Sequence, residues 1–208
     1  MFAVEGNIGA GKSTLVRRLS TQFPGKRILL AEEPVGAWDE VQDIHGNNIL
    51  TLFYRDQKRY AFSFQILACF TRFRTLIKLR EENPDDIIIC ERSLLTDYHV
   101  FAKMMAEAGN IAEEEYTIYK MNYEYFASKL PITGIIYLRT SPATAYARCM
   151  IRNRTGETVS LDYLTTCHEH HDEWIMNSTI PKLILDGNCH YTPEVEKQWS
   201  ESILSFIS

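Results

Sequence analysis

Short, continuous runs of apolar residues recur along the chain, and stretches with the spacing of amphipathic helices lie between them. The apolar runs cover residues 1–4, 27–31, 86–90, 134–138 and 183–185. A strand that is covered on both faces has such a continuous apolar sequence. The pattern therefore predicts an α/β fold with a five-stranded parallel sheet and helices on both faces. A length of 208 residues suits a single domain spanning residues 1–208.

The first apolar run leads directly into a glycine-rich segment that fits the pattern G-x-x-x-x-G-K-[ST]. The glycines allow backbone N–H groups to surround a polyphosphate, and the following helix presents its positive end. Lys12 is expected to reach the outer phosphates, and the Ser13 hydroxyl to bind Mg²⁺. The pattern predicts a P-loop NTPase-type fold that binds ATP with Mg²⁺. We place the triphosphate against Gly6, Asn7, Ile8, Gly9, Ala10, Gly11, Lys12, Ser13 and Thr14.

Charged residues follow the second and third apolar runs, at the strand ends where parallel α/β sheets bind ligands. Glu33 can accept a proton from an attacking hydroxyl beside a triphosphate. The alternative is that Glu32 and Glu33 form a solvated pair before a turn. After the third run, Glu91 can be a second Mg²⁺ anchor, and Arg92 can bind the transferring phosphoryl group.

The region 46–82 has helical spacing throughout. On an unbroken helix, Tyr54, Gln65 and Arg72 fall within about 20° of one line, and Ala68 lies close to it. These side chains form a slot for a planar polar ligand, or alternatively a polar stripe that faces solvent. The apolar side chains of the same region are expected in the core. They are Phe53, Phe62, Phe64, Leu67 and Phe70.

Asp97 lies six residues after Glu91, at the start of the next expected helix. One interpretation is an N-cap, which has no functional implication. The other is a pair with Arg72 across a pocket, where the two side chains can read a base edge. The helix expected over 110–129 carries acidic residues and tyrosines, which is typical of a solvated or subunit-facing helix.

Arginines gather after the fourth apolar run. Arg148 and Arg152 are four residues apart and share a helix face, and Arg154 enters a loop that contains a glycine. These arginines can bind the phosphates of ATP, with residues 152–160 closing over them as a lid. The alternative is a set of salt bridges to neighbouring glutamates.

The composition limits the partners. A formal charge of −5 argues against a nucleic-acid duplex, whose phosphates require a basic face. No apolar run approaches the ~18 residues of a membrane helix. The first strand begins at Met1, which leaves no room for a targeting peptide, so we expect a cytoplasmic protein without a membrane partner. The five scattered cysteines indicate reduced thiols.

The segment His168-Glu169-His170-His171-Asp172 is the one histidine cluster that invites a metal assignment. The zinc signature H-E-x-x-H requires histidine where Asp172 stands. We therefore interpret the segment as a helix surface and assign no metal to it.

Several segments together resemble the deoxyribonucleoside kinases, the group of deoxycytidine and deoxyguanosine kinases and the insect multisubstrate kinases. The resemblance covers nearly the whole chain. It rests on the loop at 6–13, Glu33-Pro34-Val35 with Trp38, Asn48-Ile49-Leu50, Phe64-Gln65, Glu91-Arg92-Ser93, the 134–138 run, and Leu161-Asp162-Tyr163-Leu164 after the arginine-rich lid. It implies transfer of the γ-phosphoryl group of ATP to the 5′-hydroxyl of a deoxynucleoside, in nucleotide salvage.

The resemblance also implies roles for individual residues. Lys12, Glu33 and Arg92 are the expected catalytic residues, with Glu33 as the base and Arg92 stabilising the 5′-oxygen and the phosphoryl group. It further suggests a homodimer, and inhibition by a deoxynucleoside triphosphate as end product.

The remaining implied contacts are to the sugar and the base. Tyr54 and Glu157 hold the 3′-hydroxyl, and Gln65 reads the base between walls of Trp38 and Phe101. Relatives that accept cytosine or purine bases have residues similar to Ala68, Arg72 and Asp97 at these positions. A polar Arg-Asp pair crowds a thymine methyl group and favours an exocyclic amine, so we expect deoxycytidine or purine deoxynucleosides to be preferred over thymidine.

Two alternatives remain open. A nucleoside monophosphate kinase of the thymidylate kinase type shares the loop and the lid, but its phosphate acceptor requires cations where Glu33 stands. A non-catalytic nucleotide switch belongs to another class. Residues 43–46 spell its D-x-x-G motif, although no strand precedes them and no N-K-x-D follows.

Overall fold

The fold is built on a five-stranded parallel sheet in the order β2-β3-β1-β4-β5. The computed structural model describes residues 1–23, 27–154 and 156–208. The strands are β1 (Phe2–Glu5), β2 (Ile28–Ala31), β3 (Ile87–Glu91), β4 (Gly134–Arg139) and β5 (Lys182–Asp186). Each differs from its predicted bounds by no more than one residue at either end, so the predicted sheet is confirmed.

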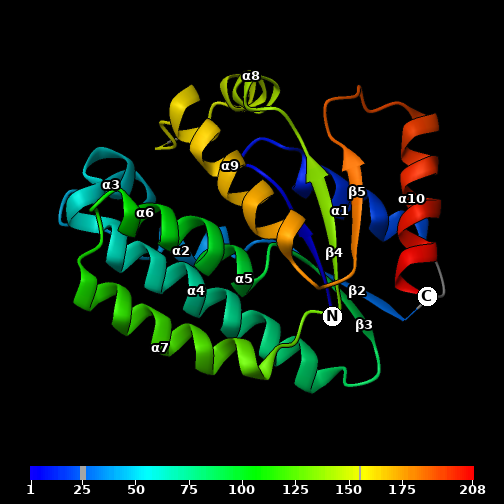
Figure 1. Cartoon of the computed structure of the whole chain (residues 1–208), viewed down its shortest axis with the longest axis horizontal. Coiled ribbons are helices and arrows are strands. Elements are labelled where there is room, and N and C mark those ends of the chain that lie inside the picture. The colour runs from blue at the N-terminus through cyan, green and yellow to red at the C-terminus, as the bar shows by residue number, and fades with distance from the viewer. Residues whose placement is uncertain (24–26, 155) are drawn as a thin grey trace.

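Helices cover both faces of this sheet (Figure 1). On one face, α1 (Lys12–Gln22) and α10 (Pro193–Ile207) pack against Val4, Ile89 and Ile136. On the other face, α7 (Glu113–Lys129) packs against Ala3 and Cys90. The helix α9 (Leu161–Asn177) joins α7 on this face and contributes Ile175, which packs against Ile135 and Tyr137. Successive strand residues point to opposite faces, so both must be apolar, and this explains the continuous apolar runs.

A separate apolar cluster lies beyond the sheet. It joins α2 (Val35–Asp39), α3 (Ile49–Arg55), α4 (Gln57–Glu82) and α6 (Lys103–Glu107). Its buried residues include Trp38, Leu50, Phe53, Phe64 and Ala68. Because the cluster stands past the carboxyl ends of the strands, it forms an apolar wall opposite the phosphate-binding loop.

The helical region predicted over 46–82 is not one unbroken helix. It divides at Asp56, which ends α3 and caps α4, because the Asp56 side chain accepts a hydrogen bond from the Arg59 backbone N–H at 3.1 Å. Asp56 itself has φ −148° and ψ 82°, outside the helical region. The single-line argument therefore holds for Gln65 and Arg72 on α4, but Tyr54 belongs to a different helix.

Two short segments follow β3: α5 (Leu94–Thr96) and a π-helical segment, η1 (Asp97–Ala102). Of the two interpretations of Asp97, the N-cap is wrong, because its carboxylate binds the Arg72 side chain and makes no cap. π-Helical turns are frequent at functional sites, and here the turn directs Asp97 and Phe101 into the cavity.

The helix expected over 110–129 is present as α7, whose Tyr119 and Tyr123 are buried. Phe70 of α4 is 45% exposed, so its predicted place in the core is wrong. It contacts Phe126 of α7 at the outer surface of the helix pair.

The helix α8 (Pro142–Arg152) carries the predicted arginines, and its last residue begins the predicted lid at 152–160. Thr155 of that lid lies outside the described residues. None of the described helices is both long and apolar enough to cross a membrane. All five cysteines are free thiols.

Candidate active site

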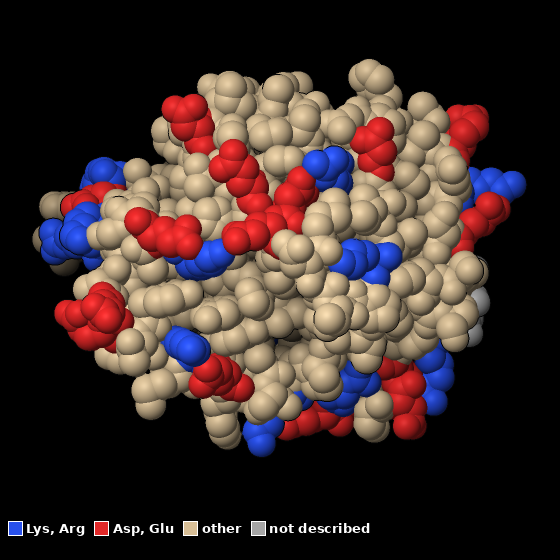
Figure 2. Space-filling view, in the orientation of Figure 1, with Lys and Arg blue, Asp and Glu red and all other residues tan. Residues whose placement is uncertain are grey.

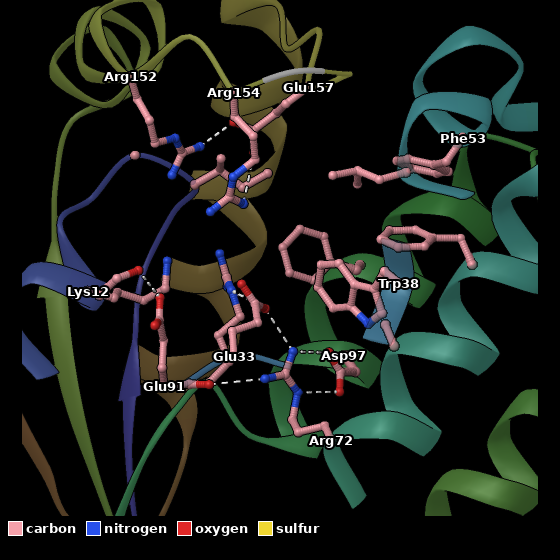
Figure 3. A pocket seen from close by; sticks show the side chains of 18 of the residues that line it. Lys12, Glu33, Trp38, Phe53, Arg72, Glu91, Asp97, Arg152, Arg154 and Glu157 are labelled. Carbon is pink, nitrogen blue, oxygen red and sulfur yellow. Dashed lines mark hydrogen bonds and ion pairs between the residues drawn. The ribbon is translucent and has the colours of Figure 1, made fainter. Parts of the chain in front are cut away.

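A cavity of about 430 Å³ lies at the carboxyl ends of β1, β2 and β3 (Figure 3). Its floor is lined by Glu33, Arg72 and Asp97, and the lid residues Arg152 and Glu157 lie across it from this floor. The loop after β1 forms one side and the aromatic wall of α2, α3 and α4 forms the other. The cavity thus joins a phosphate-binding loop and an aromatic slot in one continuous space.

The glycine-rich loop has the close backbone packing that its sequence requires. Gly9 has φ +77°, and a Cβ atom there would lie 2.4 Å from the Ala145 carbonyl oxygen. Ile8, Gly9, Gly11, Lys12, Ser13 and Thr14 line the cavity. Lys12 is buried and donates to the Asn7 carbonyl at 2.8 Å. Burial and the nearby Arg92 lower the pKa of Lys12 to about 7, although neighbouring carboxylates raise it.

Three predicted residues of the loop do not line the cavity: Gly6, Asn7 and Ala10. They hold the loop in place instead. The Asn7 side chain donates to the Leu164 carbonyl at 2.7 Å, which ties the loop to α9. A side chain at Gly6 would collide with the backbone of β4, since its Cβ would lie 2.5 Å from the Leu138 carbonyl oxygen.

Two side-chain oxygens that can bind a metal ion meet beside the loop. The Ser13 hydroxyl donates to the Glu91 carboxylate at 2.7 Å, and both residues line the cavity. A hydroxyl and a carboxylate are suitable Mg²⁺ ligands, because this ion is usually held by one or two protein oxygens together with phosphate and water. The pair therefore fits the predicted magnesium site.

Glu33 stands between two arginines on the floor of the cavity (Figure 3). Its Oε1 accepts from Arg72 at 2.8 Å and lies 3.4 Å from Nε of Arg92. Burial raises the pKa of Glu33, but Arg72, Arg92 and Lys12 outweigh it and bring the pKa to about 2. The carboxylate is therefore ionised at neutral pH and able to accept a proton. Glu32, by contrast, forms an exposed ion pair with Arg17.

Arg72 and Asp97 form a buried ion pair, as one of the two interpretations of Asp97 predicted. Nε of Arg72 donates to Asp97 at 2.8 Å, and a second nitrogen donates to the other carboxylate oxygen at 3.2 Å. A third hydrogen bond runs from Arg72 to the Glu91 carbonyl at 3.0 Å. Burial lowers the pKa of Arg72, but Asp97 and Glu33 raise it well above its usual value, so the guanidinium keeps its charge.

Aromatic side chains line the part of the cavity that also contains Gln65 and Ala68. Trp38 packs edge-on against Phe64 at 5.2 Å between ring centroids, and its indole N–H donates to Thr71 at 3.1 Å. Gln65 is buried and lines the slot, and within the described part of the chain nothing hydrogen-bonds its side-chain amide. Its donors and acceptor are therefore available to a planar polar ligand. The small side chain of Ala68 also lines this part of the cavity and leaves room beside Gln65.

Tyr54 and the lid complete the cavity. Burial and the Glu157 carboxylate raise the pKa of Tyr54 well above its usual value, so the phenol remains protonated. Glu157 accepts from Arg152 and lies 3.9 Å from Arg154. Both arginines therefore pair with a nearby glutamate, as the alternative interpretation predicted. Arg148 instead donates to the Ala10 and Gly187 carbonyls at 3.1 and 2.7 Å.

The sequence interpretation missed several residues that build the site. The cavity is also lined by Arg17, Leu50 and Tyr163. Phe53 and Phe64 line it too, although the sequence predicted only a place in the core for them. Helical spacing indicates which side chains are buried. Only the fold shows that a cavity lies beside them. His171, which contacts Arg92, was missed because its segment was considered only as a zinc motif.

In the part of the chain that the structure describes, no three His, Cys, Asp or Glu side chains gather as a metal-binding cluster. His168 pairs with Asp172, and His170 pairs with Glu107. The segment forms part of the helix α9, as predicted, but His171 is fully buried, so the interpretation as a helix surface is wrong for this residue.

This sheet order, with a glycine-rich loop after its central strand, defines a P-loop phosphotransferase, since the cavity places a carboxylate and arginines beside the phosphate site. The sequence profile of the deoxynucleoside kinase family matches residues 2–208, and the chain belongs to this family. It is therefore an ATP-dependent deoxynucleoside kinase.

Individual relatives are similar over most of their length. A probable deoxycytidine kinase of fowlpox virus is 35% identical, and the match covers 100% of this chain and 88% of that protein. Deoxycytidine kinase 2 of Gallus gallus is 34% identical, over 100% and 90% of the two chains. The mitochondrial deoxyguanosine kinase of Xenopus laevis is 33% identical, over 86% and 74%.

Proposed function

We propose that Glu33 accepts the proton of the 5′-hydroxyl of a deoxynucleoside as that oxygen attacks the γ-phosphorus of ATP. The observation that carries this role is the position of the Glu33 carboxylate, which is held between Arg72 and Arg92 and is open to the cavity. A carboxylate there suits an alcohol acceptor. An acceptor that is already a phosphate would be repelled by it. Arg92 donates to the phosphoryl group, and Lys12 binds the outer phosphates of the donor.

Mg²⁺ fits the pair of Ser13 and Glu91, whose oxygens meet at 2.7 Å beside the loop. When bound, the ion would neutralise charge on the phosphates of ATP. The chain's own residues supply the rest. When the lid closes, Arg152 and Arg154 separate from Glu157 and bind the phosphates of ATP. Arg148 holds the glycine-rich loop in place by donating to the Ala10 carbonyl.

Release from the arginines makes Glu157 available for the sugar, and we propose that Glu157 and Tyr54 hold the 3′-hydroxyl. We assign base recognition to Gln65, whose side-chain amide has no hydrogen-bond partner among the described residues, with Trp38 and Phe101 as walls.

We further propose a preference for deoxycytidine or purine deoxynucleosides over thymidine. Ala68 leaves room beside the slot, and the buried Arg72–Asp97 pair presents polar atoms where a thymine methyl group would lie. An exocyclic amine can donate to Asp97, whereas a methyl group would leave polar atoms of the pair poorly solvated.

A substrate panel with ATP and Mg²⁺ tests this function. We expect kcat/KM for deoxycytidine, deoxyadenosine or deoxyguanosine to exceed that for thymidine by about tenfold or more, a difference of about 1.4 kcal/mol. Equal or greater kcat/KM on thymidine would refute the base preference. Phosphorylation of dCMP without phosphorylation of deoxycytidine would refute the alcohol acceptor itself.

The chain is further proposed to act as a homodimer through the outer face of α4 and α7. Ile118, Met121 and Tyr125 are all exposed, and their spacing places them on one face of α7. Phe70 of α4 is also exposed. It lies near this face of α7, because it contacts Phe126, which in turn contacts Tyr125. A contiguous exposed apolar face of this kind is typical of a protein interface. A second copy is the partner that the homodimer requires.

Charged side chains of both signs are interspersed on the face shown in Figure 2. That face offers no broad basic patch of the kind that a nucleic-acid duplex requires, as far as its described residues are concerned.

We also propose end-product inhibition by a deoxynucleoside triphosphate, which the continuity of the cavity supports. Such a molecule can place its nucleoside in the slot at Gln65 and its phosphates at Lys12. We expect it to compete with both ATP and the deoxynucleoside in steady-state kinetics, and competition with neither would contradict this mode of inhibition. We propose that residues 1–208 act as one domain, with 152–160 as its lid.

A further inference from the structure

Arg92 is held in an unusual conformation at the end of β3. Its backbone has φ 63°, in the left-handed region that non-glycine residues rarely adopt, and its amide donates to the Val4 carbonyl at 2.9 Å. Its side chain is almost fully buried. Such strain persists only where the surroundings fix the residue, and it is common at active sites.

Three of the described side chains contact the guanidinium of Arg92, which also faces the cavity. Nε lies 3.4 Å from Glu33, and the group stacks over the Phe101 ring at 4.8 Å from its centroid. On the remaining side, NH1 lies 3.4 Å from Nε2 of His171. Of these neighbours, Glu33 and Phe101 are themselves expected to contact the deoxynucleoside, and His171 does not line the cavity. His171 therefore contacts Arg92 from behind.

The tautomer of His171 follows from its contacts. Nδ1 lies 2.6 Å from the Cys167 carbonyl oxygen, which can only accept, so Nδ1 carries the proton. Burial and Arg92 lower the pKa of His171 well below its usual value, so the ring is neutral. Nε2 is then an unprotonated acceptor that faces the Arg92 N–H. The ring is fully buried and parallel to Tyr137, at 6.4 Å between centroids, which fixes its plane.

We propose that His171 is a positioning residue for catalysis, whose Nε2 accepts a hydrogen bond from Arg92 and aims the guanidinium at the transferring phosphoryl group. An arginine that is held by one acceptor behind it keeps its other N–H groups directed into the cavity. Misplacement of a catalytic group by about 1 Å can cost about 100-fold in rate. Because His171 acts through Arg92, this role rests on the proposed function of Arg92.

Two substitutions separate the nitrogens of His171. In His171→Asn, the side-chain NH₂ can still donate to the Cys167 carbonyl, but nothing reaches Arg92. In His171→Gln, the side-chain oxygen can take the position of Nε2 and accept from Arg92. We expect His171→Asn to lower kcat about 10- to 100-fold, with KM for the deoxynucleoside changed less than about threefold, and His171→Gln to keep kcat within about threefold.

His168→Asn is the matched control, since it lies one turn earlier on α9 and pairs with Asp172 away from the cavity. It should leave kcat unchanged. Equal losses in His171→Asn and His171→Gln, or full kcat in His171→Asn, would overturn the role of His171. Thermal unfolding of each variant shows whether a loss of kcat reflects a loss of folded protein.

A measurement on the unaltered enzyme covers the case in which neither variant folds. Two-dimensional ¹H–¹⁵N NMR that detects imidazole nitrogens should show His171 with Nδ1 protonated and Nε2 unprotonated across neutral pH. A protonated Nε2 would overturn the proposed hydrogen bond.

Arg92→Lys separates this inference from the function on which it rests. A lysine cannot supply the forked donors of a guanidinium, so kcat should fall at least about 100-fold. Full kcat in Arg92→Lys would refute the assigned role of Arg92 and that of His171 with it. A loss in Arg92→Lys combined with full kcat in His171→Asn would refute only the positioning role.

Discussion

At the scale of single residues, the site is a small network of charges, in which Arg72 and Asp97 are buried and Glu33 is half-buried. Each carboxylate is compensated by Arg72, whose three nitrogens are all used. Removing one partner of a buried pair is costly, because the other charge remains in a low-dielectric environment without its counterion. The network should therefore respond to substitution as a unit.

A double-mutant cycle measures this coupling. Arg72→Met leaves Asp97 buried and unpaired, so we expect it to lower the free energy of unfolding by about 3–5 kcal/mol. Adding Asp97→Ala should restore part of that loss, with a coupling energy of about 0.5–3 kcal/mol in urea unfolding. Lys78→Met on the same helix is the control, since its ion pair with Glu82 is exposed and worth about 0–1 kcal/mol. Strict additivity would show that Arg72 and Asp97 do not depend on each other.

The depressed pKa of Glu33 predicts a pH dependence of stability. Its pKa is about 2 in the folded protein and near its usual value of 4.5 in the unfolded chain, so the unfolded state takes up the proton first as pH falls. The stabilisation is complete above about pH 5 and is lost as pH falls toward 2. Relative to Glu33→Gln, the unaltered protein should therefore lose stability across that window in urea unfolding. A constant difference between pH 6 and pH 3 would contradict it.

At the scale of elements, the strands were predictable because each has a continuous apolar sequence: the central strands β1, β3 and β4 are buried on both faces, and only the edge strand β5 leaves an apolar residue, Ile184, 45% exposed among the described strands. The charged residues Glu33 and Arg92 could be found because parallel strands end at one edge of the sheet. The break at Asp56 was not predicted, since the residues on both sides have helical spacing and the cap depends on one local hydrogen bond.

Other features required the fold itself. Arg72 and Asp97 are 25 residues apart, so the sequence left the cap and the ion pair as equal interpretations. His171 shares the helical spacing of the buried residues Leu164, Cys167 and Ile175, which separates it from His168 and His170, but no local pattern shows that Arg92 lies against it. Phe70 has the spacing of a core residue, but it lies on the side of α4 that α7 does not cover completely.

The cap at Asp56 can be tested by substitution. Asp56→Ala removes the acceptor for the Arg59 N–H and should lower the free energy of unfolding by about 0.5–2 kcal/mol. Asp56→Asn retains a side-chain oxygen and should stay within about 0.5 kcal/mol of the unaltered protein. Urea unfolding of the two variants measures the difference. Equal stability of both would show that the helix division does not depend on the cap.

At the scale of the whole molecule, the apolar face of α4 and α7 lies on the outside of the helix pair, while the cavity opens beyond the sheet. An interface on that face would leave the cavity open to substrates. It would also bury Met121, which is 66% exposed in the single chain.

Met121→Glu tests this interface. A carboxylate buried without a partner would be strongly unfavourable, so the variant should behave as a monomer in light scattering at concentrations where the unaltered chain is a dimer. Ile44→Glu is the control, because Ile44 is also exposed but lies in the loop before α3. A Met121→Glu protein that remains dimeric would place the interface elsewhere.

The most direct test of the account is the proton acceptor itself. Glu33→Gln keeps the size of the side chain and its hydrogen bond from Arg72 but cannot accept a proton from the 5′-hydroxyl. We predict a fall in kcat of about 10²- to 10⁴-fold, with the dissociation constant for the deoxynucleoside changed only a few-fold. An unchanged kcat in Glu33→Gln would contradict the account and place the catalytic base at another residue.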